Sequence, residues 1–190
     1  GLLVEDAQGV GAQSQRPRHP PQGDPDRDDE LVIRWAEASL LQPVLRTHEG
    51  NRPAVSAQPA EDAELAAQLA ELSRVFVALG PERERRAAQG GLADAVQHPW
   101  MFAPDAGLDG IADEELQLGP DVLLAPVLSA GATTVDVAFP PGRWQNIWTG
   151  AVFGEASSVT HETVDAPMGR PALFVREGTA VASELSAFAD

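Results

Sequence analysis

The residues best suited to chemistry lie close together between Arg46 and Arg52, directly after an apolar run. Arg46 carries five N–H donors in a planar fork, so it can hold a carboxylate or a pair of hydroxyls. His48 can donate to a sugar or phosphate oxygen, and Glu49 could act as a general acid or base. The alternative is that Arg46, Glu49 and Arg52 form an ion-pair network that braces a loop. The residue types alone leave both interpretations open.

Other kinds of reactive site are missing from the sequence. There is no cysteine, which excludes disulfides, thiolate nucleophiles and cysteine–metal sites. No two histidines lie three to five residues apart, the usual spacing of zinc ligands; they are His19, His48, His98 and His161. There is also no glycine-rich phosphate loop with a lysine, and no Gly-x-Ser-x-Gly elbow. The sequence therefore predicts neither a metal site nor a cofactor.

The charge of the chain limits its partners. The formal net charge is -16, and every basic side chain is an arginine. Such an acidic chain is repelled by nucleic acid and by anionic membranes. No apolar stretch approaches the roughly 20 residues needed to span a bilayer. Since no signal peptide is visible either, we expect a cytoplasmic protein without a nucleic-acid or membrane partner.

Helical patterns precede and follow the polar cluster. Asp28 or Asp29 can cap a helix whose apolar residues lie at helical spacing, namely Leu31, Val32, Trp35, Ala38 and Leu41. Pro43 ends this helix, and "LLQPVL" (residues 40–45) then predicts a short buried strand. A second helix over residues 61–79 carries the apolar stripe Leu65, Leu69, Leu72, Phe76 and Leu79. A polar helix follows it and ends at the C-cap signal Gly90-Gly91.

Polar residues at the carboxyl end of a strand that follows a helix are typical of one unit of a TIM barrel, where such residues form the site. We therefore assign residues 1–91 to an α/β part, with residues 1–29 irregular because they are rich in proline, glycine and charge. Residues 92–190 lack helical periodicity. They contain short β-rich runs, namely "AVQHPWMF", "DVLLAPVL", "TTVDVAF", "WQNIW", "SVTHETV" and "ALFVREG". Many short strands at close spacing predict an antiparallel β-sandwich.

Four segments resemble motifs of family 31 glycoside hydrolases, the α-glucosidase family. They are "RWAEASLLQPVLRTHEGNRP", "LGPDVLLAPVL", "PPGRWQNIWTG" and "APMGRPALFVREG". They occur in the order of the family and cover about residues 30 to 180. The first segment is most similar to the branch that includes the bacterial sulfoquinovosidases. The resemblance implies the C-terminal end of a (β/α)8 TIM barrel followed by an antiparallel β-sandwich, an α/β plus all-β chain.

The resemblance also implies a function and a role for two residues. Family members are retaining α-glycosidases, so the expected substrate is a carbohydrate, either an α-glucoside or an α-sulfoquinovoside. His48 corresponds to the histidine that touches the sugar in the −1 subsite, and Arg46 supports it. In this interpretation Glu49 only braces the loop.

The family's catalytic aspartates have no counterpart in this chain. The resemblance places both upstream, and Asp6 lies in "VEDAQGVGAQ", which departs strongly from the family's Ser-Asp-Ile-Gly-Gly segment. We therefore predict no catalytic residue here and an inactive isolated chain. Because a barrel closes only with all its strands, we also expect a folded sandwich with a loosely attached helical arm.

A different class of function stays open from the sequence. The chain could be a non-catalytic sandwich module that binds carbohydrate or a partner protein. Trp144 and Trp148 could then stack on sugars. We instead expect both indole rings to be packing residues of the sandwich.

Overall fold

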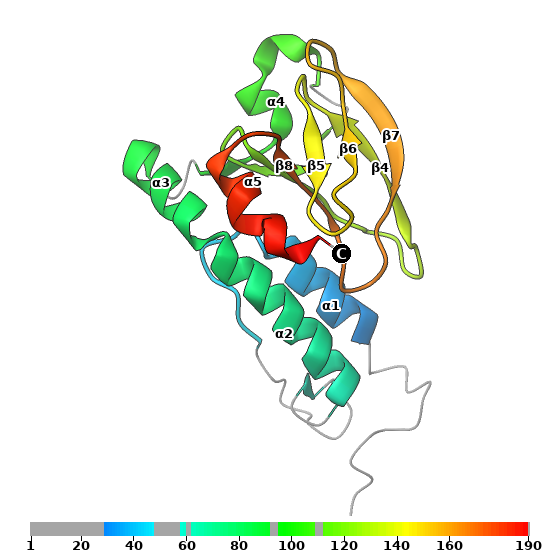
Figure 1. Ribbon diagram of the computed structural model, residues 1–190. Helices are drawn as coiled ribbons and strands as arrows, with labels where there is room; N and C mark the ends of the chain where they lie inside the picture. Colours follow the sequence, from blue (N-terminus) through cyan, green and yellow to red (C-terminus); the bar gives the residue numbers. More distant parts are fainter. Residues whose placement is uncertain (1–28, 48–57, 60–61, 92–94, 109–111, 190) are drawn as a thin grey trace, which may run out of the picture.

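The computed structural model describes residues 29–47, 58–59, 62–91, 95–108 and 112–189. The three longest helices lie along one side of the molecule and the strands along the other (Figure 1). The helices are α1 (Asp29–Ala38), α2 (Ala63–Ala78), α3 (Gly80–Gly90), α4 (Pro99–Phe102) and α5 (Ala180–Leu185), with short 3-10 turns η3 (Pro104–Ala106) and η4 (Ser186–Phe188). No described helix is long and apolar enough to cross a membrane.

The strands form two antiparallel sheets. The larger sheet has the order β1-β2-β3-β8-β5-β6, and the smaller one pairs β4 with β7. Their bounds are β1 (Val96–Gln97), β2 (Leu116–Leu118), β3 (Val122–Ala125), β4 (Thr134–Phe139), β5 (Trp144–Asn146), β6 (Val152–Phe153), β7 (Thr160–Asp165) and β8 (Ala172–Arg176). The expectation of antiparallel sheets in this half is confirmed.

The two central strands are apolar on both faces because both faces are covered. Leu124 of β3 and Leu173 of β8 are register partners that face the helices. Leu123 and Phe174 are the neighbouring pair and face the smaller sheet. Since side chains alternate along a strand, a run of consecutive apolar residues fits a sheet buried on both sides.

Helix α2 follows its predicted pattern closely. Asp62 caps it, because its Oδ1 accepts hydrogen bonds from the backbone N–H groups of Glu64 and Leu65, both at 3.0 Å. Leu65, Leu72 and Leu79 are buried, whereas Leu69 and Phe76 are half-buried. Helix α3 ends at Gly91, whose φ of 92° lies in the region that favours glycine.

One hydrophobic core joins the helices to the larger sheet, which differs from the expected loose helical arm. Ile33 of α1, Leu72 of α2 and Val181 of α5 belong to the same buried cluster as Leu124 and Leu173. The helices thus have packing partners although the described residues include no barrel strand. The division of the chain at residue 92 stays a prediction.

One predicted strand is wrong, and the predicted strand "AVQHPWMF" is confirmed only in part, as β1. Leu40 and Leu41 lie in a turn after α1, and residues 44–47 belong to no helix or strand among the described parts of the chain. A strand needs neighbours to satisfy its N–H and C=O groups, and none of the described strands pairs with this segment. The segment "PWMF" forms α4 and not a strand, because Pro99 at its first turn favours a helical start.

The buried face of α1 also differs from the prediction. Leu31 and Trp35, expected inside, are 54% and 70% exposed. The face that is buried contains Ile33 and Ala36, together with the charged residues Arg34, which is 9% exposed, and Glu37, which is 1% exposed. Hydrophobic spacing cannot predict this face, because it treats the two charges as solvent-facing.

Candidate functional site

Of the two predicted sugar-binding residues, Arg46 and His48, the structure describes only Arg46. Arg46 lies in the irregular segment after α1 and is exposed. His48, like Glu49 and Arg52, lies outside the described residues. The proximity of Arg46 to His48 therefore stays a prediction. The described structure does show which contacts hold the turn that precedes Arg46.

Arg83 of α3 holds the turn that precedes Arg46. Its Nη1 donates to the carbonyl of Leu40 at 3.1 Å, and its Nη2 donates to the carbonyl of Phe76. The guanidinium also lies 3.9 Å from the centroid of the Phe76 ring, a cation–π contact. Burial lowers the pKa of Arg83, because desolvation disfavours the charged form. A buried cation thus fixes the turn from which Arg46 extends.

Arg34 and Glu37 fasten α1 to the β-rich half. Arg34 donates to a Glu37 carboxylate oxygen at 2.9 Å and to the carbonyls of Ala166 at 3.1 Å and Ala132 at 2.7 Å. The other oxygen of Glu37 accepts from the backbone N–H of Gly169 at 2.7 Å. Burial raises the pKa of Glu37, although its hydrogen bonds from Arg34 and Gly169 work in the opposite direction.

This anchor was missed by the sequence analysis. Arg34 and Glu37 appear there only as letters of the first family-like segment, with no role assigned to either. The sequence does contain a sign of the pair. Arg34 and Glu37 are opposite charges three residues apart, and they directly follow the buried positions 33 and 36. Such pairs are more often exposed to solvent. A buried pair can therefore be predicted only when its partners on distant loops are known.

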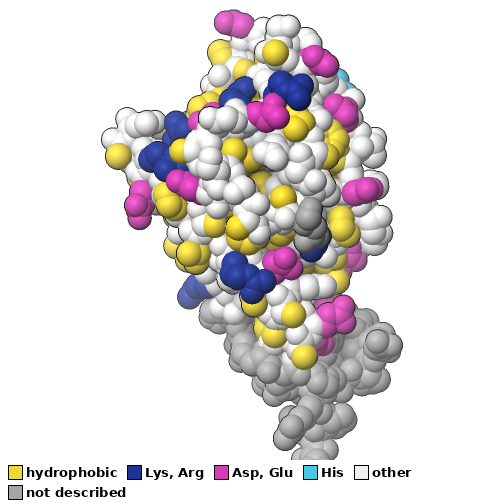
Figure 2. All heavy atoms as spheres, in the orientation of Figure 1, with side chains coloured by type: hydrophobic (Ala, Val, Ile, Leu, Met, Phe, Trp, Pro, Cys, Tyr) yellow, Lys and Arg dark blue, Asp and Glu magenta, His cyan; other side chains and the backbone are white. Residues whose placement is uncertain are grey.

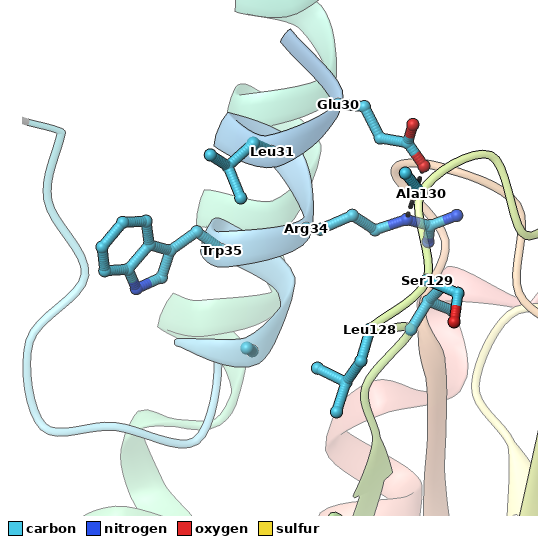
Figure 3. A pocket seen from close by; sticks show the side chains of 9 residues that line it. Glu30, Leu31, Arg34, Trp35, Leu128, Ser129 and Ala130 are labelled. Atoms are coloured by element: carbon cyan, nitrogen blue, oxygen red, sulfur yellow. Dashed lines mark ion pairs between the residues drawn. The ribbon is translucent and has the colours of Figure 1, made fainter. Parts of the chain in front are cut away.

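An apolar groove lies beside this anchor (Figure 3). Leu31 and Trp35 point to one side of α1, while Glu30 and Arg34 point across to the loop that carries Ser129 and Ala130. Leu128, which is 64% exposed, forms part of the groove's lining. The groove has a volume of about 290 Å³.

A second buried carboxylate lies in the β-rich half. Glu115, just before β2, is 5% exposed, and its Oε1 accepts from the backbone N–H of Ala138 at 2.7 Å. Its Oε2 is buried without a hydrogen-bond partner. Desolvation raises the pKa of Glu115 to about 7, and the bond from Ala138 only partly offsets this.

Trp144 and Trp148 are packing residues, as expected. They are 0% and 3% exposed. The indole Nε1 of Trp144 donates to the carbonyl of Pro140 at 2.9 Å, and that of Trp148 donates to the carbonyl of Pro171 at 2.7 Å. Because neither ring faces solvent, neither can serve as a platform for a sugar.

Titratable side chains do not cluster as metal ligands. Among the residues that the structure describes, no group of three or more histidine, aspartate or glutamate side chains could hold a metal ion. The Nδ1 of His98 and the carbonyl oxygen of Glu115 form a hydrogen bond of 2.9 Å. Its ring is stacked with that of Trp100 at 6.5 Å between centroids.

Charged side chains on the surface are mixed in sign. Figure 2 shows arginine and acidic side chains interspersed over the face in view. Several of them are paired across elements, as in the two hydrogen bonds of 3.0 and 3.1 Å from Arg85 of α3 to Glu184 of α5. Arg86 likewise donates to Asp121 at 2.9 Å. These pairs hold α3 against α5 and against the larger sheet.

Known proteins resemble this chain in sequence and in fold. Residues 95–181 match the glycosyl hydrolase family 31 C-terminal domain. A sulfoquinovosidase of Agrobacterium fabrum is 36% identical over 155 residues, which are 79% of this chain and 23% of that protein. A sulfoquinovosidase of Escherichia coli is 37% identical over 157 residues, which are 79% of this chain and 22% of that protein.

The fold agrees with the sequence match. The structure of a family 31 sulfoquinovosidase from E. rectale, in complex with the aza-sugar inhibitor IFGSQ, superimposes with a TM-score of 0.75 and 29% identity. The match covers 85% of this chain and 24% of that one. The chain thus spans about a quarter of the length of these relatives. It belongs to glycosyl hydrolase family 31, of which it represents the C-terminal portion.

Proposed function

We propose that this chain is the C-terminal part of a retaining α-glycosidase that hydrolyses α-sulfoquinovosides or α-glucosides. The observation that carries the proposal is the 36% identity to a sulfoquinovosidase over 79% of the chain. The likeness in fold to a sulfoquinovosidase bound to an aza-sugar inhibitor supports it. In this proposal the segment after α1 completes the rim of a catalytic barrel whose other units precede this region.

The proposed chemistry divides between this chain and the region that precedes it in the relatives. Retaining glycosidases use two carboxyl groups about 5–5.5 Å apart, one as nucleophile and one as acid and base. We assign neither to this chain. His48 donates a hydrogen bond to a sugar hydroxyl, and Arg46 supports the segment that carries it. Arg83 fixes the turn before this segment through the Leu40 carbonyl, so the geometry of the rim depends on α3.

A chimera tests this function. The C-terminal quarter of the Agrobacterium fabrum sulfoquinovosidase is replaced by this chain, and hydrolysis of p-nitrophenyl α-sulfoquinovoside and p-nitrophenyl α-glucoside is measured. We expect the chimera to hydrolyse at least one of them, and the isolated chain to hydrolyse neither. His48→Ala in the chimera should lower kcat/KM by about 100-fold, because a contact to the sugar in the transition state is lost.

The control for this variant is His161→Ala, since His161 is exposed on β7. It should leave kcat/KM of the chimera unchanged. A folded chimera without activity would contradict the proposed function and favour the non-catalytic module. Turnover by the isolated chain would contradict the assignment of both catalytic carboxylates to the preceding region.

A further inference from the structure

We propose that the apolar groove on α1 is the surface on which the preceding, catalytic part of a family 31 hydrolase packs. The inference rests on the proposed function, because it takes this chain as the C-terminal part of such an enzyme. It goes further by assigning the contact to three named side chains, Leu31, Trp35 and Leu128.

The first argument is the exposure of these side chains. Leu31 is 54%, Trp35 70% and Leu128 64% exposed, and they come from a helix and a loop that are distant in sequence. Single apolar side chains at the surface are ordinary, but large ones that line a common groove mark an interaction site. An exposed indole is the most costly of the three to leave in water.

The second argument is the composition of α1. One face of this helix is already buried, with Ile33 and Ala36 in the core shared with α2 and the larger sheet. Leu31 and Trp35 give it a second apolar face. A helix that is apolar on two sides is typically covered on both.

The third argument is that both charged side chains beside the groove, Glu30 and Arg34, are already engaged within this chain, with only the Nε of Arg34 lacking a hydrogen bond. Glu30 accepts hydrogen bonds from the backbone N–H of Gly131 at 2.9 and 3.0 Å. Arg34 is engaged by Glu37 and by two backbone carbonyls. A sugar needs polar partners, whereas an apolar protein surface does not. The groove therefore suits protein packing.

The fourth argument identifies the occupant. The chain spans about a quarter of its relatives and matches a C-terminal domain, so in those proteins the larger part precedes this region. Helix α1 is the first described element, and its residues Glu30 and Leu31 line the groove. The groove is thus formed by the described helix that lies nearest in sequence to that larger part.

Hydroxyl-radical footprinting with mass spectrometry tests the proposal on the isolated 190-residue chain and on the chimera with the Agrobacterium fabrum sulfoquinovosidase. We expect oxidation of Trp35 to fall about fivefold or more in the chimera, because covering a 70% exposed ring removes most of its contact with water. Met101, which is 44% exposed on α4, is the internal control and should be oxidised equally in both. Equal oxidation of Trp35 in both proteins would overturn the proposal.

Variants separate this surface from the proposed function. Trp35→Ser should leave the thermal midpoint of the isolated chain unchanged and lower that of the chimera, whereas Met101→Ser should have the same small effect in both. A chimera without activity but with protected Trp35 would refute the function and support the surface. An active chimera that tolerates Trp35→Ser would refute the surface and support the function.

Two further outcomes concern other occupants. If the isolated chain forms a dimer that Trp35→Ser abolishes, the occupant is a second copy and the proposal is wrong. It is also wrong if Trp35 becomes reactive only after residues 1–28 are removed. Should the chimera not fold, the two parts are co-expressed as separate polypeptides. Recovery of this chain with the upstream part, lost in Trp35→Ser, supports the proposal, and no recovery overturns it.

Discussion

At the scale of single residues, Glu115 couples the stability of the fold to pH. Its carboxyl group is buried, with only one oxygen hydrogen-bonded, to the N–H of Ala138. The pKa is raised from 4.5 to about 7 in the folded chain. The neutral form is therefore favoured by folding. The contribution is fully present below pH 4.5 and is lost as the pH rises through about 7.

We expect Glu115→Gln to remove this pH dependence. The amide oxygen of glutamine can still accept from Ala138, and no charge has to be buried. A shift from 4.5 to about 7 corresponds to roughly 3 kcal/mol of unfolding free energy. Urea unfolding at pH 5 and pH 8 should show the variant more stable than the parent at pH 8 and similar at pH 5. The neighbouring exposed variant Glu114→Gln serves as control, and an equal gain there would contradict the assignment.

At the scale of elements, the position of α1 depends on a buried ion pair and not on its apolar face alone. Arg34 and Glu37 reach backbone groups of the loops at Ala132, Ala166 and Gly169. Removing one partner of a buried pair leaves the other charge without compensation, which costs more than the pair itself contributes. The helix that leads to Arg46 is therefore fixed by groups far away in the sequence.

Glu37→Ala should destabilise the chain by about 3–5 kcal/mol, because it removes the buried carboxylate that accepts from Arg34 and from the Gly169 N–H. Urea unfolding measures the loss. Glu84→Ala, an exposed glutamate in the middle of α3, is the matched control and should change stability by less than about 1 kcal/mol. Equal effects of both variants would show that the pair does not anchor α1.

The same pair explains where prediction from sequence succeeded and failed. The leucines of α2 share one stripe, and β3, β4 and β8 are continuous or alternating apolar runs, so local spacing was enough to predict them. The face of α1 depends on Ala132, Ala166 and Gly169, which no local pattern can reveal. "LLQPVL" has the composition of a strand, but none of the described strands pairs with it. For the candidate site, the sequence predicts the residue types. Their arrangement in space stays a prediction, since His48 lies outside the described residues.

At the scale of the whole molecule, the helices and the sheets unfold as one body in our interpretation. Ile33, Leu72 and Leu173 share one core. Hydrogen exchange should therefore show protection in α1 and α2 similar to that in β3 and β8, because cooperative units follow shared cores. Mass-resolved exchange of the full chain measures this. Fast exchange across α1 and α2 beside slow exchange in the sheet would contradict it and would restore the loosely attached arm.

The shared core has a consequence for how this region can be moved between proteins. The family's C-terminal domain is matched from residue 95, after the three long helices. A recombination point placed there would divide the core between two parents, and the helix-facing side chains Leu124, Leu173 and Val175 would meet foreign partners. A crossover before Asp29 keeps these contacts within one parent. Gene fusions and natural shuffling of this module should therefore tolerate the earlier boundary and reject the later one.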